Sequence, residues 1–248
     1  MKISLITVVY NRAATIERTI LSVLQQTYPH IEYIVVDGAS TDGTLNIIHQ
    51  YRDRINQFIS EKDNGVYDAI NKGIQLATGD IVGVLHADDR FAHPDVINNI
   101  VQHFSSHPLL ECMFGDVCFV RPENPNEIIR YVSSSIFNLN RFRYGIMPAH
   151  PTFYCYKKFF DIHGLYRTDL DIAADFDLLL RFLKIHKLTF KYIPELMIEM
   201  NVGGKSTSGL SSTLQINREI RQVLKEHKIR SSYLHLYSRY FLKIREFF

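Results

Sequence analysis

The first half of the chain alternates short apolar runs with stretches of helical periodicity. Runs rich in Val and Ile are typical of buried parallel strands, which helices join into βαβ units. Four such runs lie at residues 5–9, 31–36, 57–62 and 81–85. A helical spacing of apolar residues follows each run, at residues 13–26, 42–52, 66–77 and 94–104. The pattern predicts an α/β fold with a mostly parallel central sheet flanked by helices.

Beyond about residue 105 the pattern is less regular. Residues 112–120 and 127–132 flank a polar turn and predict a β-hairpin. A helix is expected at 175–186, a late strand at 189–200, and two closing helices at 212–227 and 230–246. Residues 203–209 have the Gly/Ser composition of a loop, which fits either a lid over a bound molecule or a plain connector.

Composition narrows the class of protein without changing this picture. The 248 residues are 46% apolar and 22% charged, which is ordinary for a globular protein with a substantial core. Lys and Arg number 28 against 26 Asp and Glu, and a net charge of +2 gives no reason to expect a nucleic acid partner. The three cysteines lack C-x-x-C spacing, so a reducing cytoplasm fits best. No stretch approaches the roughly 18 apolar residues of a membrane span.

Acidic and amide side chains follow each of the four apolar runs. In chain order these are Tyr10-Asn11, Asp37, Asp63-Asn64-Gly65 and Asp88-Asp89. In an open parallel sheet, ligands bind just beyond the carboxyl ends of the strands. Because these residues form no glycine-rich phosphate loop, the edge suits a nucleotide that is held partly through a divalent metal ion.

Asp88 and Asp89 are the sharpest of these features. Adjacent carboxylates after a buried strand repel each other and lose hydration, which is unfavourable unless a cation or hydrogen-bond donors compensate. Mn²⁺ or Mg²⁺ prefers carboxylate and phosphate oxygens, so Asp89 could join such an ion to a diphosphate and stabilise it as a leaving group. The alternative is a pair of exposed loop aspartates.

Three further positions have both a chemical and a structural interpretation. Asp175, at the start of the predicted helix 175–186, could take a proton from an attacking hydroxyl as a general base, or could cap the helix. Lys72 could add positive charge at a helix N-terminus that faces a phosphate, or could pair with Asp68. His150 could contact a diphosphate or an acceptor, although a single His before Pro is more often structural.

Taken together, these residues resemble the family 2 glycosyltransferases of the GT-A fold, bacterial enzymes that build surface polysaccharides. The resemblance extends over about residues 1–205. It rests on the order of Thr7-Val8-Val9-Tyr10-Asn11, Asp37 to Thr44, Asp63 to Asp68 with Asn71, Asp88-Asp89 and Asp175. It implies a Rossmann-like GT-A domain at 1–210, with a nucleotide-binding half at 1–105 and an acceptor-binding half at 106–210. Residues 211–248 would then form a C-terminal helical extension.

The resemblance also implies an activity and a role for each residue. Such enzymes use a nucleotide-diphosphate sugar, Mn²⁺ or Mg²⁺ and a single Asp base, and they invert the anomeric centre. The implied nucleotide-binding residues are Thr7, Tyr10, Asn11, Asp37, Asp63, Asn71, Lys72 and Asp88. Asp89, with Asp88, would hold the metal ion, and Asp175 would be the catalytic base.

Three positions depart from the family pattern. Gly38 stands where many members have a second Asp, which implies fewer contacts to the nucleoside. His86 replaces the first Asp of the usual D-x-D motif, so the metal ion is left to the two aspartates that follow. Ala174 replaces the Glu of a Glu-Asp pair, which leaves Asp177 as a second candidate for the base.

The C-terminal residues mix basic with aromatic side chains. The basic ones are Arg218, Arg221, Lys225, Lys228, Arg230, Arg239, Lys243 and Arg245. A basic amphipathic helix can lie on an anionic leaflet, which would bring the protein to the inner face of the cytoplasmic membrane, near a lipid-linked acceptor. Alternatively, the helix packs on its own domain or on a second copy in a homodimer.

We therefore predict an inverting, metal-dependent glycosyltransferase. It would move a sugar from a nucleotide-diphosphate donor, a UDP-sugar by family habit, to a glycan hydroxyl in capsule, O-antigen or exopolysaccharide synthesis. Two alternatives stay open. A sugar-nucleotide nucleotidyltransferase has a related sheet but usually needs a glycine-rich, basic segment near its N-terminus. A catalytically idle subunit of a polysaccharide assembly complex would fit the departures at His86 and Ala174.

Overall fold

The strands form one mixed sheet within the residues that this computed structural model describes, which are 1–121, 124, 127–202 and 210–243. Their order is β3-β2-β1-β4-β8-β6-β9-β5, and β7 pairs with β6. The strands are β1 (Ile3–Val9), β2 (Ile31–Asp37), β3 (Gln57–Ser60), β4 (Ile81–Val84), β5 (Asp89–Phe91), β6 (Cys112–Val120), β7 (Ile128–Val132), β8 (Tyr154–Tyr156) and β9 (Phe190–Asn201).

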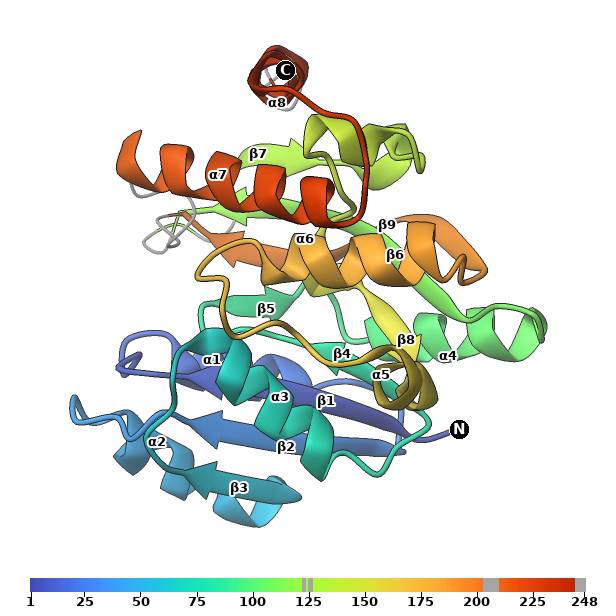
Figure 1. The fold of residues 1–248 in the computed structure, drawn as a ribbon. Helices are drawn as coiled ribbons and strands as arrows, with labels where there is room; N and C mark the ends of the chain where they lie inside the picture. Colours follow the sequence, from blue (N-terminus) through green and yellow to red (C-terminus); the bar gives the residue numbers. More distant parts are fainter. Residues whose placement is uncertain (122–123, 125–126, 203–209, 244–248) are drawn as a thin grey trace.

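The first four strands pair in parallel, as the apolar runs predict. β1 lies between β2 and β4, and β3 pairs with the far edge of β2. Because their carboxyl ends point the same way, the loops that follow them meet at one edge of the sheet (Figure 1). The polar residues that end these strands are therefore brought close together, which sets the position of the candidate site.

The second half of the sheet is more mixed than the sequence indicates. The predicted hairpin of β6 and β7 is confirmed, and β9 pairs in parallel with β6. Two short strands were not predicted: β8 joins β4 to β6 in antiparallel fashion, and β5 adds an antiparallel edge to β9. The mostly parallel arrangement thus holds for the first half of the sheet.

Helices cover both faces of this sheet (Figure 1). They are α1 (Ile16–Leu24), α2 (Thr44–Gln50), α3 (Val66–Leu76), α4 (Val96–Ser106), α5 (Lys157–His163), α6 (Ala174–Leu179), α7 (Leu210–Glu226) and α8 (Tyr233–Lys243). A π-helical turn, Leu180–Ile185, continues α6 and completes the helix that the sequence predicts at 175–186. No helix among these described elements is both long enough and apolar enough to cross a bilayer.

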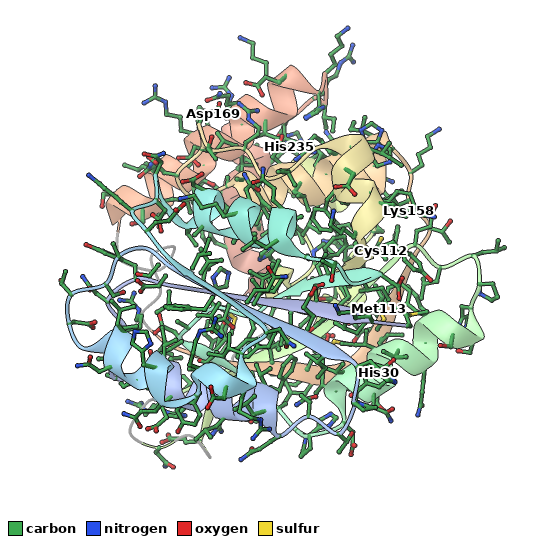
Figure 2. All side chains as sticks on the ribbon, turned by 90° about the horizontal axis from the view of Figure 1, so that it is seen from below. His30, Cys112, Met113, Lys158, Asp169 and His235 are labelled. Atoms are coloured by element: carbon green, nitrogen blue, oxygen red, sulfur yellow. The ribbon has the colours of Figure 1, made fainter. Side chains whose placement is uncertain are left out.

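The sheet separates two hydrophobic cores. An α3-side core lies under α3, α5, α6 and α7, and an α1-side core lies under α1, α2 and α4. Successive side chains of a strand point to opposite faces, so each strand supplies both cores. Cys112 and Met113 are neighbours in β6, yet Cys112 lies in the α3-side core and Met113 in the α1-side core (Figure 2).

Glu32 fastens the amino ends of the parallel strands, opposite the candidate site. Its buried carboxylate accepts hydrogen bonds from Lys2 Nζ at 2.8 Å, Ser4 Oγ at 2.5 Å and the Thr78 amide at 2.7 Å. Burial alone would raise its pKa, but these hydrogen bonds lower the pKa from 4.5 to about 2. An ionised Glu32 therefore joins β1, β2 and the turn before β4.

Helix α8 packs on the domain through one face. Leu236 is fully buried in the α3-side core, and Arg239 is only 3% exposed. The Arg239 guanidinium donates to the Gly145 carbonyl and to Asn217 Oδ1, both at 2.9 Å. The sequence groups Arg239 with the other basic residues near the C-terminus, and the structure shows that its side chain is buried and anchors α8 to the body of the protein.

Candidate functional site

The loops after β1 and β2 interlock through Asn11. The Asn11 amide donates to Ser40 Oγ at 2.8 Å, and Asn11 Oδ1 accepts a hydrogen bond from the Thr41 amide at 2.8 Å. The Arg12 amide donates to Thr44 Oγ1 at 2.8 Å. Asn11 has a positive φ of 50°, a conformation that Asn tolerates better than most residues. These contacts hold together the loops after β1 and β2, which form the rim of the candidate site.

Asp37 offers a buried acceptor at this rim. Its Oδ2 accepts hydrogen bonds from the Ser40 amide at 3.0 Å and from Ser60 Oγ at 2.6 Å. Its Oδ1 is buried and has no hydrogen-bond partner in the described part of the chain. Buried polar atoms are nearly always paired, so this oxygen is suited to accept a hydrogen bond from a ligand, such as a nucleobase N–H.

Tyr10 and Asp63 surround Gly38, next to Asp37. The Tyr10 side chain is 58% exposed, and Asp63 Oδ1 accepts a hydrogen bond from the Gly65 amide at 2.9 Å. A Cβ atom at position 38 would collide with the Asp63 carboxylate. The structure thus explains the departure at Gly38: a second aspartate there would require Asp63 to move. The predicted residues Tyr10, Asp37 and Asp63 are brought together at one end of the site.

Three predicted nucleotide-binding residues make contacts within the protein. Thr7 is completely buried within β1, where Tyr33 donates to its hydroxyl at 3.2 Å. Asn71 forms two hydrogen bonds with the backbone of Tyr166, at 2.8 and 2.9 Å. Lys72 Nζ lies 2.7 Å from a Glu61 carboxylate oxygen and 3.6 Å from one of Asp68. Thr7 is as enclosed as Asp37 but has a hydrogen-bond partner within the protein, and its contact with a nucleotide stays a prediction.

Asp88 is the accessible member of the acidic pair. Its side chain is 35% exposed, and its two oxygens accept hydrogen bonds from Arg12 Nε and Thr15 Oγ1, both at 2.8 Å. Its backbone carbonyl accepts a hydrogen bond from Asn201 Nδ2 at 2.9 Å, which joins the end of β9 to this turn. Asp88 therefore presents a negative charge at the edge where the parallel strands end.

Asp89, in contrast, points into the protein. It begins β5, its side chain is buried, and Oδ2 finds no hydrogen-bond partner among the described residues. Burial raises the pKa of this carboxyl well above its usual range, and the nearby charge of Asp88 adds to the effect. Asp88 is therefore the more accessible of the two carboxyl groups, and the roles of Asp88 and Asp89 as metal ligands stay predictions.

The oxygen ligands that the protein offers suit a metal ion that is also bound by the diphosphate of a substrate. Within the described residues, no three His, Cys, Asp or Glu side chains lie close enough to hold an ion by themselves. Mg²⁺ commonly binds through one or two carboxylates together with substrate phosphates, and Mn²⁺ prefers the same oxygen ligands. Asp88 supplies one such carboxylate, and Arg12 and Thr15 orient it.

Asp175 is the best-placed candidate base. It lies in the first turn of α6, partly exposed, and its Oδ1 accepts a hydrogen bond from the Phe176 amide at 2.7 Å. Desolvation of this largely enclosed carboxyl raises the pKa of Asp175 to about 7, although the hydrogen bond from the Phe176 amide acts in the opposite direction. A carboxyl of this pKa can both accept and release a proton near neutral pH.

Asp177, the alternative base, is enclosed by cations. Its Oδ2 lies 2.7 Å from Arg181 Nε, and its Oδ1 lies 3.4 Å from His227 Nε2 and 3.8 Å from Arg167 Nη1. The side chain is fully buried beneath α7 residues and these partners. The Asp177 carboxylate is enclosed by these partners, so its contacts favour a structural role.

A line of aromatic side chains connects Asp175 to the Asp88 turn. Tyr67 stacks on Tyr166, with ring centroids 5.8 Å apart, and the Tyr166 hydroxyl lies 2.7 Å from His150 Nε2. The ring of His150 lies 6.1 Å from that of His86, which belongs to the turn before Asp88. Burial lowers the pKa of both histidines, that of His150 to about 3, so both are neutral.

This line contains site residues that sequence reasoning missed. Tyr67 lies inside the segment Asp63 to Asp68, so its motif was recognised although its own role was not. Tyr166 belongs to no motif, and only its hydrogen bonds with Asn71 and His150 reveal it. His150 was foreseen as a contact at the site. The structure adds that its ring faces Tyr166 and leaves the diphosphate contact a prediction.

Comparison with known proteins identifies the family. The sequence model described as "Glycosyl transferase family 2" matches residues 4–163, well over half of the chain. The chain belongs to glycosyl transferase family 2. A curated relative, a PGL/p-HBAD biosynthesis glycosyltransferase of Mycobacterium bovis, is 28% identical over 214 residues, which is 85% of this chain and 79% of that protein.

Solved structures show that this family 2 chain has the GT-A fold. Staphylococcus aureus TarS 1–349 in complex with UDP-GlcNAc superimposes with a TM-score of 0.69 at 19% identity, covering 90% of this chain and 66% of that one. The mannosyltransferase PcManGT from Pyrobaculum calidifontis, in complex with GDP-Man and Mn²⁺, gives 0.66 at 18% identity, covering 93% and 65%. This chain therefore spans about two thirds of each of these structures.

Proposed function

We propose that this family 2 glycosyltransferase inverts the anomeric centre while moving a sugar from a nucleotide diphosphate to a glycan hydroxyl. The donor would be a UDP-sugar and the product a surface polysaccharide of the capsule, O-antigen or exopolysaccharide type. The related TarS structure holds UDP-GlcNAc, whereas PcManGT holds GDP-Man, so the nucleotide is the least constrained part of the proposal.

One observation carries this proposal. A carboxyl with a pKa of about 7, Asp175, is connected through Tyr67, Tyr166 and His150 to the turn that bears Asp88. Direct displacement needs a base on the acceptor side and a stabilised leaving group on the donor side. Asp175 would be the base, and the neighbourhood of Asp88 would stabilise the leaving group. No covalent intermediate is then required.

Different residues of the site would bind the nucleoside, hold the metal ion and accept the proton. Asp37 Oδ1 would accept a hydrogen bond from the base, while Tyr10 and Asp63 enclose the nucleoside. Asp88 would hold Mn²⁺ or Mg²⁺, which when bound supplies positive charge to a departing diphosphate. Asp175 would take the proton of the acceptor hydroxyl as that hydroxyl attacks.

The decisive test compares Asp175→Asn with the wild-type protein in two assays. The variant should lose transfer by roughly 10²–10⁴-fold because the base is gone. It should bind UDP-sugar with Mn²⁺ as the wild type does, measured by titration calorimetry, because the nucleotide rim is unchanged. Asp177→Asn is the rival variant, and full transfer by Asp175→Asn with loss in Asp177→Asn would move the base to Asp177.

The two alternative functions can be separated by simple assays. A nucleotidyltransferase would release pyrophosphate from a nucleoside triphosphate and a sugar phosphate, and we expect none. An idle assembly subunit would show neither transfer nor slow hydrolysis of any nucleotide sugar. Release of pyrophosphate would replace the proposed reaction with nucleotidyl transfer. A lack of both transfer and hydrolysis would mean that the protein is not a catalyst.

A further inference from the structure

Helix α8 has an exposed face as well as the buried one. Leu236 and Arg239 point into the protein, whereas Leu234 is 82% exposed, Tyr233 44% and Tyr237 40%. The rings of Tyr233 and Tyr237 lie 6.4 Å apart, so they form a continuous aromatic strip along the helix. α8 lies at the opposite end of the molecule from α2 and β3 (Figure 1).

Cations border this strip. Arg218, Arg221 and Lys225 are exposed on α7 and, being three and four residues apart, share one face of that helix. Arg221 Cζ lies 4.4 Å from the centre of the Tyr233 ring, which places this face of α7 against the exposed strip of α8. Lys228 and Arg230, in the connection between the two helices, are also exposed.

The acidic residues of α7 do not neutralise these cations. Glu219 is buried and accepts hydrogen bonds from the amides of Ile172 and Ala173, both at 2.9 Å. Glu226 pairs with Arg167, and this partner lowers its pKa. The α7–α8 surface, defined by Arg218, Arg221, Lys225, Lys228, Arg230, Tyr233, Leu234 and Tyr237, is therefore aromatic and strongly positive.

We propose that the α7–α8 surface binds an anionic lipid bilayer. Tyrosine suits the boundary between hydrocarbon and water because it has an apolar ring and a polar tip. Basic residues near an anionic leaflet each add to the affinity, and Leu234 can enter the apolar layer. The buried contacts of Arg239 and Leu236 hold the strip outward, so binding needs no rearrangement of the domain.

A second copy of the chain fits this surface less well. A two-fold dimer would place the same patch of each protomer against the other. The five cations of one copy would then face those of its partner, and none of the residues that define the patch is acidic. An anionic partner removes this repulsion, which is why a lipid surface is favoured.

Vesicle flotation of the full-length chain tests the proposal. We expect binding to vesicles of phosphatidylcholine with phosphatidylglycerol, little binding to phosphatidylcholine alone, and weaker binding at high salt. Arg218→Gln with Lys225→Gln should lower the partition coefficient roughly 30-fold, at about 1 kcal/mol per cation. Leu234→Glu should also lower it, because a carboxylate cannot enter the apolar layer.

The matched control is Arg54→Gln with Lys158→Gln, which removes the same charge from exposed positions outside this surface. It should bind vesicles as the wild type does. Equal binding to neutral and anionic vesicles, or unchanged binding of the α7 variant, would overturn the proposal. So would a dimer in sedimentation velocity that Leu234→Glu dissociates without any vesicle binding, since the surface would then join two copies.

Discussion

At the scale of single residues, burial sets the pH range in which Asp175 can act. Its pKa is about 7, and a general base must be ionised to accept a proton. We therefore expect kcat/KM to rise with pH through about 7 and to level off above it. Initial rates across that range give the profile. A flat profile from about pH 6 to 8 would mean that another group is the base.

The two aspartates after β4 should behave differently when they are replaced. Asp88→Ala removes the accessible carboxylate and should abolish the gain in nucleotide affinity that Mn²⁺ provides. Asp89→Asn keeps the shape of an enclosed side chain and leaves the exposed carboxylate of Asp88 in place, so this gain should stay within a few-fold of wild type. Titration calorimetry of UDP with and without Mn²⁺ measures both. The opposite result would return the metal ion to Asp89.

Sequence reasoning could foresee which residues lie at the ends of the strands better than it could foresee their surroundings. Tyr10, Asp37 and Asp63 could be foreseen because each ends or follows a strand whose direction was predicted. The burial of Thr7, and the cations around Asp177, could not be foreseen. Both depend on which face of an element a side chain occupies and on partners distant in sequence, such as Tyr33 and His227.

At the scale of elements, the length of a strand or helix decided whether the sequence could predict it. Strands β1 to β4 and helices α1 to α4 carry enough apolar residues to show a period. β5 and β8 have three residues each, too few to show alternation, and they pair only because the sheet offers them partners. The mixed second half of the sheet is therefore a property of tertiary pairing.

A close contact between β4 and β8 gives a test of this pairing. A Cβ on Gly83 would collide with the ring of Tyr154, which is completely buried on the neighbouring strand. Gly83→Ala should therefore reduce the free energy of unfolding by about 1–3 kcal/mol, as overpacking does. Urea denaturation measures the change.

Tyr154→Phe is the matched control for that contact. It keeps the ring and removes a buried hydroxyl that has no hydrogen-bond partner in the part of the chain described. Its stability should equal or exceed that of the wild type. An unfolding midpoint of Gly83→Ala equal to the wild-type value would show that β8 lies farther from β4 than described.

At the scale of the whole molecule, Arg239 decides how the C-terminal helix is attached. Arg239→Ala leaves the Gly145 carbonyl and Asn217 Oδ1 without their donor and should cost about 1–3 kcal/mol. Limited proteolysis between α7 and α8 should become faster. Arg54→Ala, at an exposed position outside this connection, is the control and should be cut at the wild-type rate. Equal rates for both variants would show that α8 is held by other contacts.

The attachment of α8 marks the limit of sequence reasoning at this scale. Its basic and aromatic residues predict an amphipathic helix, but they do not say which cation faces inward. Arg239 lies among residues of similar type and is distinguished only by acceptors from a 3-10 turn and from α7. Composition alone therefore overestimates the exposed charge and cannot orient the surface.

Two carboxyl groups, Glu32 on β2 and Asp175 on α6, make the stability of the fold respond to acid in opposite directions. Glu32 has a folded pKa of about 2 against 4.5 when unfolded, so its contribution to stability is present above pH 4.5 and is lost as pH falls toward 2. Asp175 has a folded pKa of about 7 against 3.8, so its ionisation destabilises the fold as pH rises between those values. From these two groups, the melting temperature should be higher near about pH 5 than near pH 8.

Melting curves of Asp175→Asn and Glu32→Gln separate the two effects. In Asp175→Asn, the melting temperature should no longer fall between mildly acidic and alkaline buffer. In Glu32→Gln, it should no longer fall in strong acid through this group. A wild-type melting temperature that climbs steadily from pH 5 to pH 8 would contradict this balance. If this balance holds, the fold is most stable at a mildly acidic pH, where Asp175 is mostly protonated and the proposed transfer is slow. Ionising Asp175, which the proposed reaction requires, then lowers the stability of the fold.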